Sequence, residues 1–235
     1  MLTQITKSQL YYFSLIFIPL TTLFFAVSLI YFYSVNNANL EALKQSEFYR
    51  LFIQNQAFEK EIDNIVDDLV ILTSHQEFNA FLNEQEHDYS LLEQEYLVFA
   101  KQKTMCDQVR LLDKSGHEKI RINYKKSSHD LVEKEALQFK GERYYFKDTI
   151  GLNAGEIFIS AFDLNVEKGK IEVPLKPTIR FGMPVINGAG EKIGVLILNY
   201  LGQSLIDSIE KSTFQKNHFS KMLITNAEGF FYSWA

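Results

Sequence analysis

A long stretch without any charged side chain lies close to the start of this chain. No Asp, Glu, Lys or Arg occurs between Ser8 and Asn39, and residues 11–33 are almost wholly apolar. A helix of about 23 residues rises about 34 Å, which exceeds the roughly 30 Å of hydrocarbon in a bilayer. Tyrosines at both ends, including Tyr11 and Tyr33, would lie at the level of the lipid headgroups. The pattern therefore predicts a transmembrane helix over 11–33.

A cleaved signal peptide or a buried core helix would also contain a run of apolar residues. A signal peptide has a shorter apolar region, of about 7–15 residues, which is followed by small residues at the cleavage site. The stretch in this chain is longer and ends in Tyr31, Phe32 and Tyr33. A core helix of this length without one charge would be unusual. We therefore favour a membrane anchor.

The charges around the anchor predict its orientation. Lys7 is the only basic residue before the span, and Glu41, Lys44 and Glu47 follow on the far side. By the positive-inside rule, the first residues would lie in the cytoplasm. We expect a single-pass protein of the inner (cytoplasmic) membrane, with residues 1–10 as a cytoplasmic tail and everything after the helix in the periplasm.

The composition argues against several classes of function. The chain has 235 residues, a net charge of −5 and one cysteine, Cys106. A single thiol allows neither an intrachain disulfide nor a cysteine-based metal site. No basic stripe with interleaved aromatics is present, which argues against nucleic acid as a partner. No catalytic motif is found, and the five histidines lie far apart in polar stretches. We expect no enzymatic activity in this chain, no metal and no cofactor.

Residues 36–73 are predicted to form one long helix, and a second helical stretch leads to residue 103. Apolar residues in the long helix repeat in two interleaved seven-residue series, as in a coiled coil. Either this stripe packs on the sheet of its own domain, or it pairs with a second copy as a stalk, and both can hold for different parts. A homodimer through the long helix is expected. The stripe consists of Phe48, Leu51, Phe58, Ile62, Ile65, Leu69 and Leu72, with Asn55 as the polar break.

Beyond residue 103 the apolar pattern takes the period of strands. Runs at 106–112 and 118–124 flank Asp113-Lys114-Ser115-Gly116, which is typical of a β-hairpin. A final hairpin over 222–233 has no partner strands within the chain and would open a second domain. The fold class is α+β, with the long helix packed on an antiparallel sheet of about five strands. The other predicted elements are strands at 156–162, 178–186 and 192–201, a short helix or loop at 130–139, and helices at 77–82, 91–103 and 204–212.

A set of polar and aromatic residues occurs at strand and loop positions after residue 103. The planar fork of arginine suits a carboxylate or a phosphate, because it offers two parallel donors. Aromatic rings can wall a small pocket. The alternative is that these arginines pair with Asp107, Asp148, Asp163 or Glu172 and hold loops in place. The candidate ligand-binding residues of this set are Arg121, Asn123, Arg143, Tyr145, Phe146, Ser160, Asp163 and Arg180.

Several segments of the chain follow one another in an order that occurs in a known family. They are Asp107-Gln108-Val109-Arg110-Leu111-Leu112-Asp113 with Ile120-Arg121-Ile122-Asn123, then Arg143-Tyr144-Tyr145-Phe146, then residues 155–160 with 163–165, then 171–174 with 179–181, and then 194–202. Together these segments resemble double-Cache (PAS-like) sensor domains, which occur in bacterial histidine kinases, diguanylate cyclases and chemoreceptors. The resemblance covers about residues 40–235.

The resemblance implies two PAS-like modules after the long helix. Residues 104–214 would be the membrane-distal module, which holds the ligand, and residues 215–235 would begin a truncated membrane-proximal module. A second transmembrane helix and a cytoplasmic output domain would follow, such as the histidine kinase of a two-component system or a diguanylate cyclase.

The resemblance also implies a ligand-binding position in the closing strand, and there the chain departs from part of the family. Members that bind amino acids have an Asp at this position, which holds the ligand's ammonium group, whereas the similar position here is Asn199. A neutral amide cannot supply that charge. An α-amino acid is therefore disfavoured, and a carboxylate or another small molecule is favoured. Asn199 joins the candidate residues.

The sequence thus predicts the extracytoplasmic small-molecule sensor region of a transmembrane signal-transduction receptor. Ligand binding in the distal module would be relayed through the long helix. One alternative is an ectodomain that binds a protein partner or only dimerises, with no small-molecule ligand. A membrane-bound hydrolase is disfavoured because no motif supports it.

Overall fold

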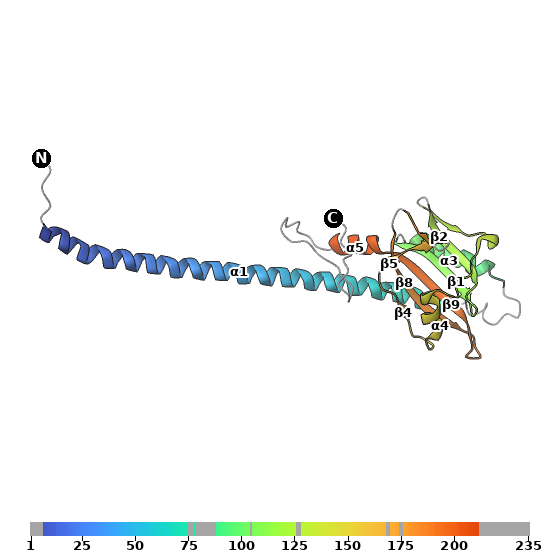
Figure 1. The fold of residues 1–235 in the computed structure, drawn as a ribbon. Coiled ribbons are helices and arrows are strands. Elements are labelled where there is room, and N and C mark those ends of the chain that lie inside the picture. Colours follow the sequence, from blue (N-terminus) through green and yellow to red (C-terminus); the bar gives the residue numbers. More distant parts are fainter. Residues whose placement is uncertain are drawn as a thin grey trace. The chain divides into compact units, whose positions relative to one another are not determined.

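The computed structural model divides the chain into two compact units, Met1–Ile53 and Gln54–Ala235. Figure 1 shows a long helix and, in the second unit, a sheet with shorter helices. The predicted hairpin over 222–233, the 215–235 module and nearly all of the helical piece at 77–82 lie outside the described residues. The structure describes residues 7–74, 78, 88–103, 105–125, 128–167, 170–173 and 176–211.

The first unit contains the start of a single long helix, α1 (Lys7–Ser74). The apolar side chains of its first part are exposed, as Phe24 and Ile30 illustrate. Pro19 lies inside the helix, and Thr22 Oγ1 donates a hydrogen bond to the Pro19 carbonyl oxygen at 2.9 Å. By length and composition alone, α1 is the one helix among the described residues that could cross a membrane. Residues 11–33 are therefore helical, as predicted.

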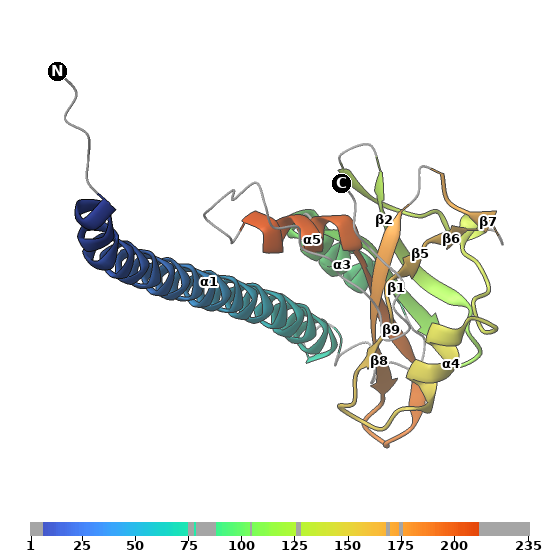
Figure 2. The ribbon, with the colours of Figure 1, turned by 60° about the vertical axis from the view of Figure 1, so that its left-hand side comes forward.

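The second unit is built on one antiparallel sheet, which Figure 2 shows with helices on its two sides. The strand order is β3-β2-β1-β9-β8-β4, and β5 also pairs with β8. The strands are β1 (Cys106–Asp113), β2 (Glu118–Lys125), β3 (Ser128–Leu131), β4 (Phe158–Ile159), β5 (Asp163–Leu164), β8 (Pro177–Ile186) and β9 (Lys192–Leu201). The predicted α+β fold, with a long helix and an antiparallel sheet, is confirmed.

The remaining elements are short helices and one small ribbon. They are α3 (Ser90–Gln102), the 3-10 helix η1 (Lys134–Ala136), α4 (Tyr144–Gly151), the ribbon of β6 (Val166–Glu167) with β7 (Lys170–Ile171), and α5 (Gly202–Lys211). Two sequence predictions need correction. The strand expected over 156–162 is only β4, because the backbone leaves the sheet after Ile159 and returns as β5. Part of the segment expected as a helix or loop over 130–139 belongs to β3, which is polar and therefore gives no apolar alternation.

One face of the sheet carries the main core of the second unit. Alternate residues of the strands point to this face, because side chains alternate along a strand. Val109 of β1 and Leu198 of β9 are examples, and they pack with Leu69 of α1 and Tyr96 of α3 in one buried cluster. The end of α1 and the whole of α3 therefore cover the same apolar face.

The apolar stripe of α1 divides into a packed part and an exposed part. Ile65, Leu69 and Leu72 are buried in the core, so packing on the domain's own sheet holds for this end of the stripe. Phe48 and Leu51, which belong to the first unit, are 77% and 57% exposed. The pairing of this exposed part with a second copy remains a prediction.

The opposite face of the sheet is partly covered by α4, and a glycine allows this helix to lie close to the strands. A Cβ atom on Gly182 of β8 would lie 2.3 Å from Thr149 Oγ1 and 2.7 Å from Ile197 Cδ1. Contacts this short are not tolerated, so a larger residue would require the side chains of Thr149 and Ile197 to move. Gly182 thereby permits the close approach of Thr149 of α4 to β8.

Asp113 organises the turn between β1 and β2. Its Oδ1 accepts hydrogen bonds from the Ser115 backbone N–H at 2.9 Å, from Ser115 Oγ at 2.6 Å and from the His117 backbone N–H at 3.0 Å. Its Oδ2 lies 3.1 Å from Lys119 Nζ. Burial alone would raise the pKa of Asp113, but these hydrogen bonds outweigh it and lower the pKa to about 2. The ionised carboxylate therefore stabilises the hairpin.

We expect Asp113→Asn to lower the free energy of unfolding by about 1–2 kcal/mol at pH 7, after allowance for partial exposure. Because the folded-state pKa lies below the ordinary value of 3.8, this stabilisation is present above about pH 4 and is lost as the pH falls through about 2. Denaturant unfolding of both proteins at pH 7 and near pH 2 measures it. Glu135→Gln, at an exposed carboxylate of η1, is the control, and equal stabilities at pH 7 would contradict the prediction.

Candidate functional site

A row of four polar residues crosses the middle of the sheet on the face opposite the main core. Asn123 of β2 pairs with Gln108 of β1, which pairs with Asn199 of β9, which pairs with Arg180 of β8. Residues directly opposite each other in antiparallel strands project to the same face. Gln108, Asn199 and Arg180 are buried, and Asn199 Nδ2 donates to Gln108 Oε1 at 2.7 Å. The pairing register therefore creates a buried polar line.

Arg180 is held at the end of this row by residues that precede it in the chain. Its guanidinium group forms an ion pair with Asp163 of β5. It also donates to the Tyr144 hydroxyl and to Asn165 Oδ1, both at 3.3 Å, while its backbone N–H donates to Ser160 Oγ at 2.9 Å. Burial, followed by the hydrogen bond to Asp163, raises the pKa of Tyr144, so the Tyr144 hydroxyl is a neutral donor.

The ring of Tyr145, at the start of α4, lies among three arginines. Arg110 Nη1 of β1 donates to the Tyr145 hydroxyl at 3.1 Å. The guanidinium carbons of Arg180 and Arg143 lie 5.3 Å and 5.8 Å from the ring centroid. Because the face of an aromatic ring is electronegative, it attracts these cations. Tyr145 thus connects the arginines of β1, β8 and the α4 N-terminus.

Glu118 of β2 is the second carboxylate of the site. Its Oε1 lies 3.4 Å from Arg110 Nε, and its Oε2 lies 2.9 Å from Arg121 Nη1. All three residues are buried. Together with Asp163, Glu118 balances two of the four guanidinium groups at Arg110, Arg121, Arg143 and Arg180. These six side chains therefore carry a net positive charge.

Several polar atoms on this face have no hydrogen-bond partner among the residues that the structure describes. The donors are Arg180 Nε and Arg121 Nε, and the acceptors are Asn199 Oδ1 and Asn123 Oδ1. Buried polar atoms are almost always hydrogen-bonded in native proteins. The face therefore offers both donors and acceptors to a polar molecule or to water.

The family model for the sensor domain of bacterial histidine kinases matches residues 36–234 of this chain. The chain belongs to this family. It is similar to the extracellular domain described for the histidine kinase vpHK1S-Z8, with 26% identity and a TM-score of 0.63 over 73% of this chain and 63% of that one. It is also similar to a domain described for a sensory box/GGDEF family protein from Vibrio parahaemolyticus, with 25% identity and a TM-score of 0.62 over 77% and 69% of the two chains.

A third extracellular domain, described for the histidine kinase soHK1S-Z6, shows the same fold at 9% identity, with a TM-score of 0.50 over 67% of this chain and 60% of that chain. The comparison with curated protein sequences gave no match. The chain thus spans 63%, 69% and 60% of the three solved domains. Sensor domains are receptor regions rather than enzymes, and the match assigns no catalytic domain to this chain.

The sensor domain brings together most of the residues that the sequence singled out. Arg121, Asn123, Arg180 and Asn199 lie on one face of the sheet, as their pairing register requires. Arg143 and Tyr145 lie beside it at the start of α4, whereas Phe146 belongs to a neighbouring apolar cluster with Ile197. Ser160 and Asp163 contact Arg180. Ligand binding by these residues is a proposal.

The candidate residues from the sequence did not include five further members of the site, Gln108, Arg110, Glu118, Tyr144 and Asn165. The position of Gln108, two residues before Arg110 in a strand, places both on one face and is a signal that could have been used. The alternative that the arginines pair with nearby acids holds for Arg180 and Asp163. Asp107 instead pairs with Lys176 Nζ at 2.9 Å, and Glu172 lies 3.4 Å from the same atom.

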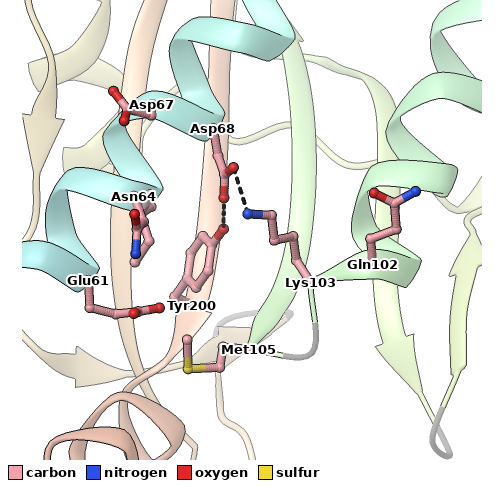
Figure 3. Close-up of a pocket in the computed structure, with 9 residues that line it drawn as sticks. Glu61, Asn64, Asp67, Asp68, Gln102, Lys103, Met105 and Tyr200 are labelled. Atoms are coloured by element: carbon pink, nitrogen blue, oxygen red, sulfur yellow. Dashed lines mark hydrogen bonds and ion pairs between the residues drawn. The ribbon is translucent and has the colours of Figure 1, made fainter.

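A pocket of about 400 Å³ lies on the other face of the sheet, between α1, the end of α3 and β9. In Figure 3 the side chains of Lys103 and Tyr200 both point toward Asp68 of α1. Asp68 accepts a hydrogen bond from the Tyr200 hydroxyl at 3.2 Å and pairs with Lys103 Nζ at 2.7 Å. Burial, followed by nearby Cys106, raises the pKa of Tyr200, so its hydroxyl remains a neutral donor. These bonds connect the sheet directly to α1.

Proposed function

We propose that the chain is the extracytoplasmic small-molecule sensor region of a transmembrane signal-transduction receptor. The observation that carries this proposal is the buried polar face of the sheet opposite the main core, with unpaired atoms at Arg121, Asn123, Arg180 and Asn199. A ligand of a few atoms would exchange hydrogen bonds with these groups, which are too deeply buried for contact with a large partner. Membership of a sensor-domain family supports the same function.

The charge of the site favours an anionic ligand, in particular a carboxylate. The site contains four guanidinium groups and two carboxylates, so a further negative charge would be attracted. Arg143 is half-buried and lies at the edge of the site, where it can meet an arriving anion. An α-amino acid is less suitable because Asn199, a neutral amide, would face its ammonium group.

The proposed arrangement has the N-terminus in the cytoplasm and the inner membrane crossed by residues 11–33. Residues 104–214 would form the membrane-distal module in the periplasm, and residues 215–235 would begin a membrane-proximal module. An apolar helix near the N-terminus and the family match support this arrangement. A second membrane helix and an output domain would follow, either the histidine kinase of a two-component system or a diguanylate cyclase.

The strand β9 is the proposed route from the ligand to the long helix. Its consecutive residues Asn199 and Tyr200 point to opposite faces, because side chains alternate along a strand. Asn199 faces the polar row, whereas the Tyr200 hydroxyl donates to Asp68 of α1. A ligand that binds one position of β9 more tightly than another would shift the position of Asp68, and only such a difference in affinity can produce a signal.

A thermal-unfolding screen of the full chain in detergent micelles tests the proposed function. Small carboxylates, amines and neutral compounds would be compared at a high and a low concentration. A true ligand at one hundred times its dissociation constant should add about 2.7 kcal/mol to the free energy of unfolding. Arg143→Ala should raise its Kd about tenfold, whereas Lys147→Ala, at an exposed lysine of α4, should not. A screen in which no compound stabilises the chain would contradict the proposal.

The exposed part of the α1 stripe favours a second candidate, an ectodomain that acts through dimerisation or a protein partner. Phe48, Tyr49 and Phe52 are exposed and line a groove of about 390 Å³ together with Lys44 and Gln45. Contiguous exposed aromatic surface on a soluble helix typically marks an interaction site. The proposed homodimer would use this surface, and both functions can belong to one receptor.

A further inference from the structure

The contact between Arg180 and Asp163 contains the groups of a carboxylate-binding site, and the protein's own Asp163 supplies the carboxylate. The Arg180 side chain is 1% exposed, whereas that of Asp163 is 33% exposed. Asp163 accepts from the Arg180 guanidinium group and, at 2.6 Å, from the Tyr144 hydroxyl. A buried guanidinium and a neutral hydroxyl donor beside an aromatic wall are the groups that bind the carboxylate of a small molecule.

The donors of Arg180 are not all engaged by this internal carboxylate. Arg180 Nη2 donates to Asn165 Oδ1 at 3.3 Å, and Arg180 Nε has no partner among the described residues. Asn199, directly opposite Arg180 in the sheet, has an unpaired Oδ1. Asp163 therefore satisfies only part of the hydrogen-bonding capacity at this end of the polar row.

The strand that carries Asp163 is weakly held. β5 pairs with β8 through two residue pairs, Asp163 with Thr178 and Leu164 with Pro177, and one further backbone hydrogen bond follows, from the Asn165 N–H to the Lys176 carbonyl oxygen at 2.9 Å. Pro177 has no backbone N–H and cannot donate to the ladder. Local opening requires little free energy where so few backbone hydrogen bonds must break. Asp163 can thus leave Arg180 without disruption of the long strands β8 and β9.

We propose that Asp163 is an internal substitute for the carboxylate of the ligand, which displaces it from Arg180 and Tyr144. This inference rests on the proposed function and specifies its ligand as a carboxylate. One carboxylate replaces another, so the buried guanidinium is never left without a counter-charge, which would be strongly unfavourable. Because the internal carboxylate occupies the site for most of the time, the affinity for the ligand is reduced by the fraction of open sites.

Acetate is the probe that tests this exchange, because it is the smallest stable analogue of the Asp163 side chain. Its Kd for the full chain in detergent micelles would be measured by titration calorimetry and by thermal unfolding. The variants are Asp163→Ala, which removes the internal carboxylate, and Asp148→Ala, which removes an exposed carboxylate of α4 as a control for net charge. Acetamide, which has the shape of acetate without its charge, is the control ligand.

The expected result is a Kd for acetate at least tenfold lower for Asp163→Ala than for the unmodified chain. Asp148→Ala should change this Kd by less than about twofold, and acetamide should bind neither protein. An equal or higher Kd for Asp163→Ala, or no binding of acetate to it, would overturn the inference. If Asp163→Ala does not fold, Asp163→Asn, which keeps the size and one acceptor, is judged by the same criterion.

The outcomes separate this inference from the proposed function. A ligand found in the screen whose Kd is unchanged by Asp163→Ala would leave the sensor function in place and show that Asp163 does not compete for the site. Tight binding of acetate by Asp163→Ala, with no stabilising compound for the unmodified chain, would support the carboxylate receptor at Arg180 and contradict the sensor function.

Discussion

Glu118→Ala is expected to lower the free energy of unfolding by about 3–5 kcal/mol, the usual cost when one partner of a buried ion pair is removed. Glu118 is buried and is the counter-charge of both Arg110 and Arg121. Its Oε2 also accepts a hydrogen bond from the Gln138 backbone N–H at 2.9 Å. The substitution would remove this carboxylate from beside two buried guanidinium groups.

Denaturant unfolding of the full chain in detergent micelles measures this effect. Glu133→Ala, at an exposed glutamate just before η1, is the matched control and should change the stability by less than about 0.5 kcal/mol. Glu118→Gln keeps the shape but not the charge, so its loss should lie between those of the other two variants. If Glu118→Ala were as stable as Glu133→Ala, the buried charge cluster would not exist as described.

Leu69→Ala is expected to lower the free energy of unfolding by about 2–5 kcal/mol, because Leu69 of α1 is fully buried against the sheet. Phe48→Ala removes a larger side chain from the same stripe and should cost less than about 0.5 kcal/mol, because Phe48 is 77% exposed. Thermal or denaturant unfolding at low protein concentration compares the two variants.

Sedimentation at increasing protein concentration measures the self-association of the same two variants. Phe48→Ala should weaken self-association, if the exposed part of the stripe pairs with a second copy, whereas Leu69→Ala should not do so beyond its effect on folding. Similar losses of stability for both variants at low concentration would contradict the division of α1 into a packed and an exposed part.

Local patterns predicted the long elements of this fold well. The β1–β2 hairpin was readable from the turn at Asp113 to Gly116, since the carboxylate and the glycine each have a role in the turn that is independent of distant residues. The apolar stripe of α1 was also predicted from the sequence, but the position at which it changes from buried to exposed was not. That change depends on where the sheet ends, and the helical period carries no information on it.

Elements that depend on distant contacts were missed or misjudged. α4 has only eight residues, too few for a helical period to emerge, and its position depends on Gly182 in a later strand. Strand β3 is held by pairing with β2 rather than by its own apolar residues. Arg180 was found because an arginine among apolar neighbours is conspicuous. Gln108 was missed because its partner Asn199 is far away in sequence and is fixed only by the register of β1 and β9.

The two-residue strands β4 and β5 have a consequence for how such receptors change over time. They pair with β8 at one edge of the sheet, where Asp163 contacts Arg180, but they contribute little to the main core. Substitutions or insertions between α4 and β8 can therefore change the residues around Arg180 while the contacts between β9 and α1 remain intact. Members of the family can in this way diverge on the polar side of the sheet and still keep the packing of the sheet on α1.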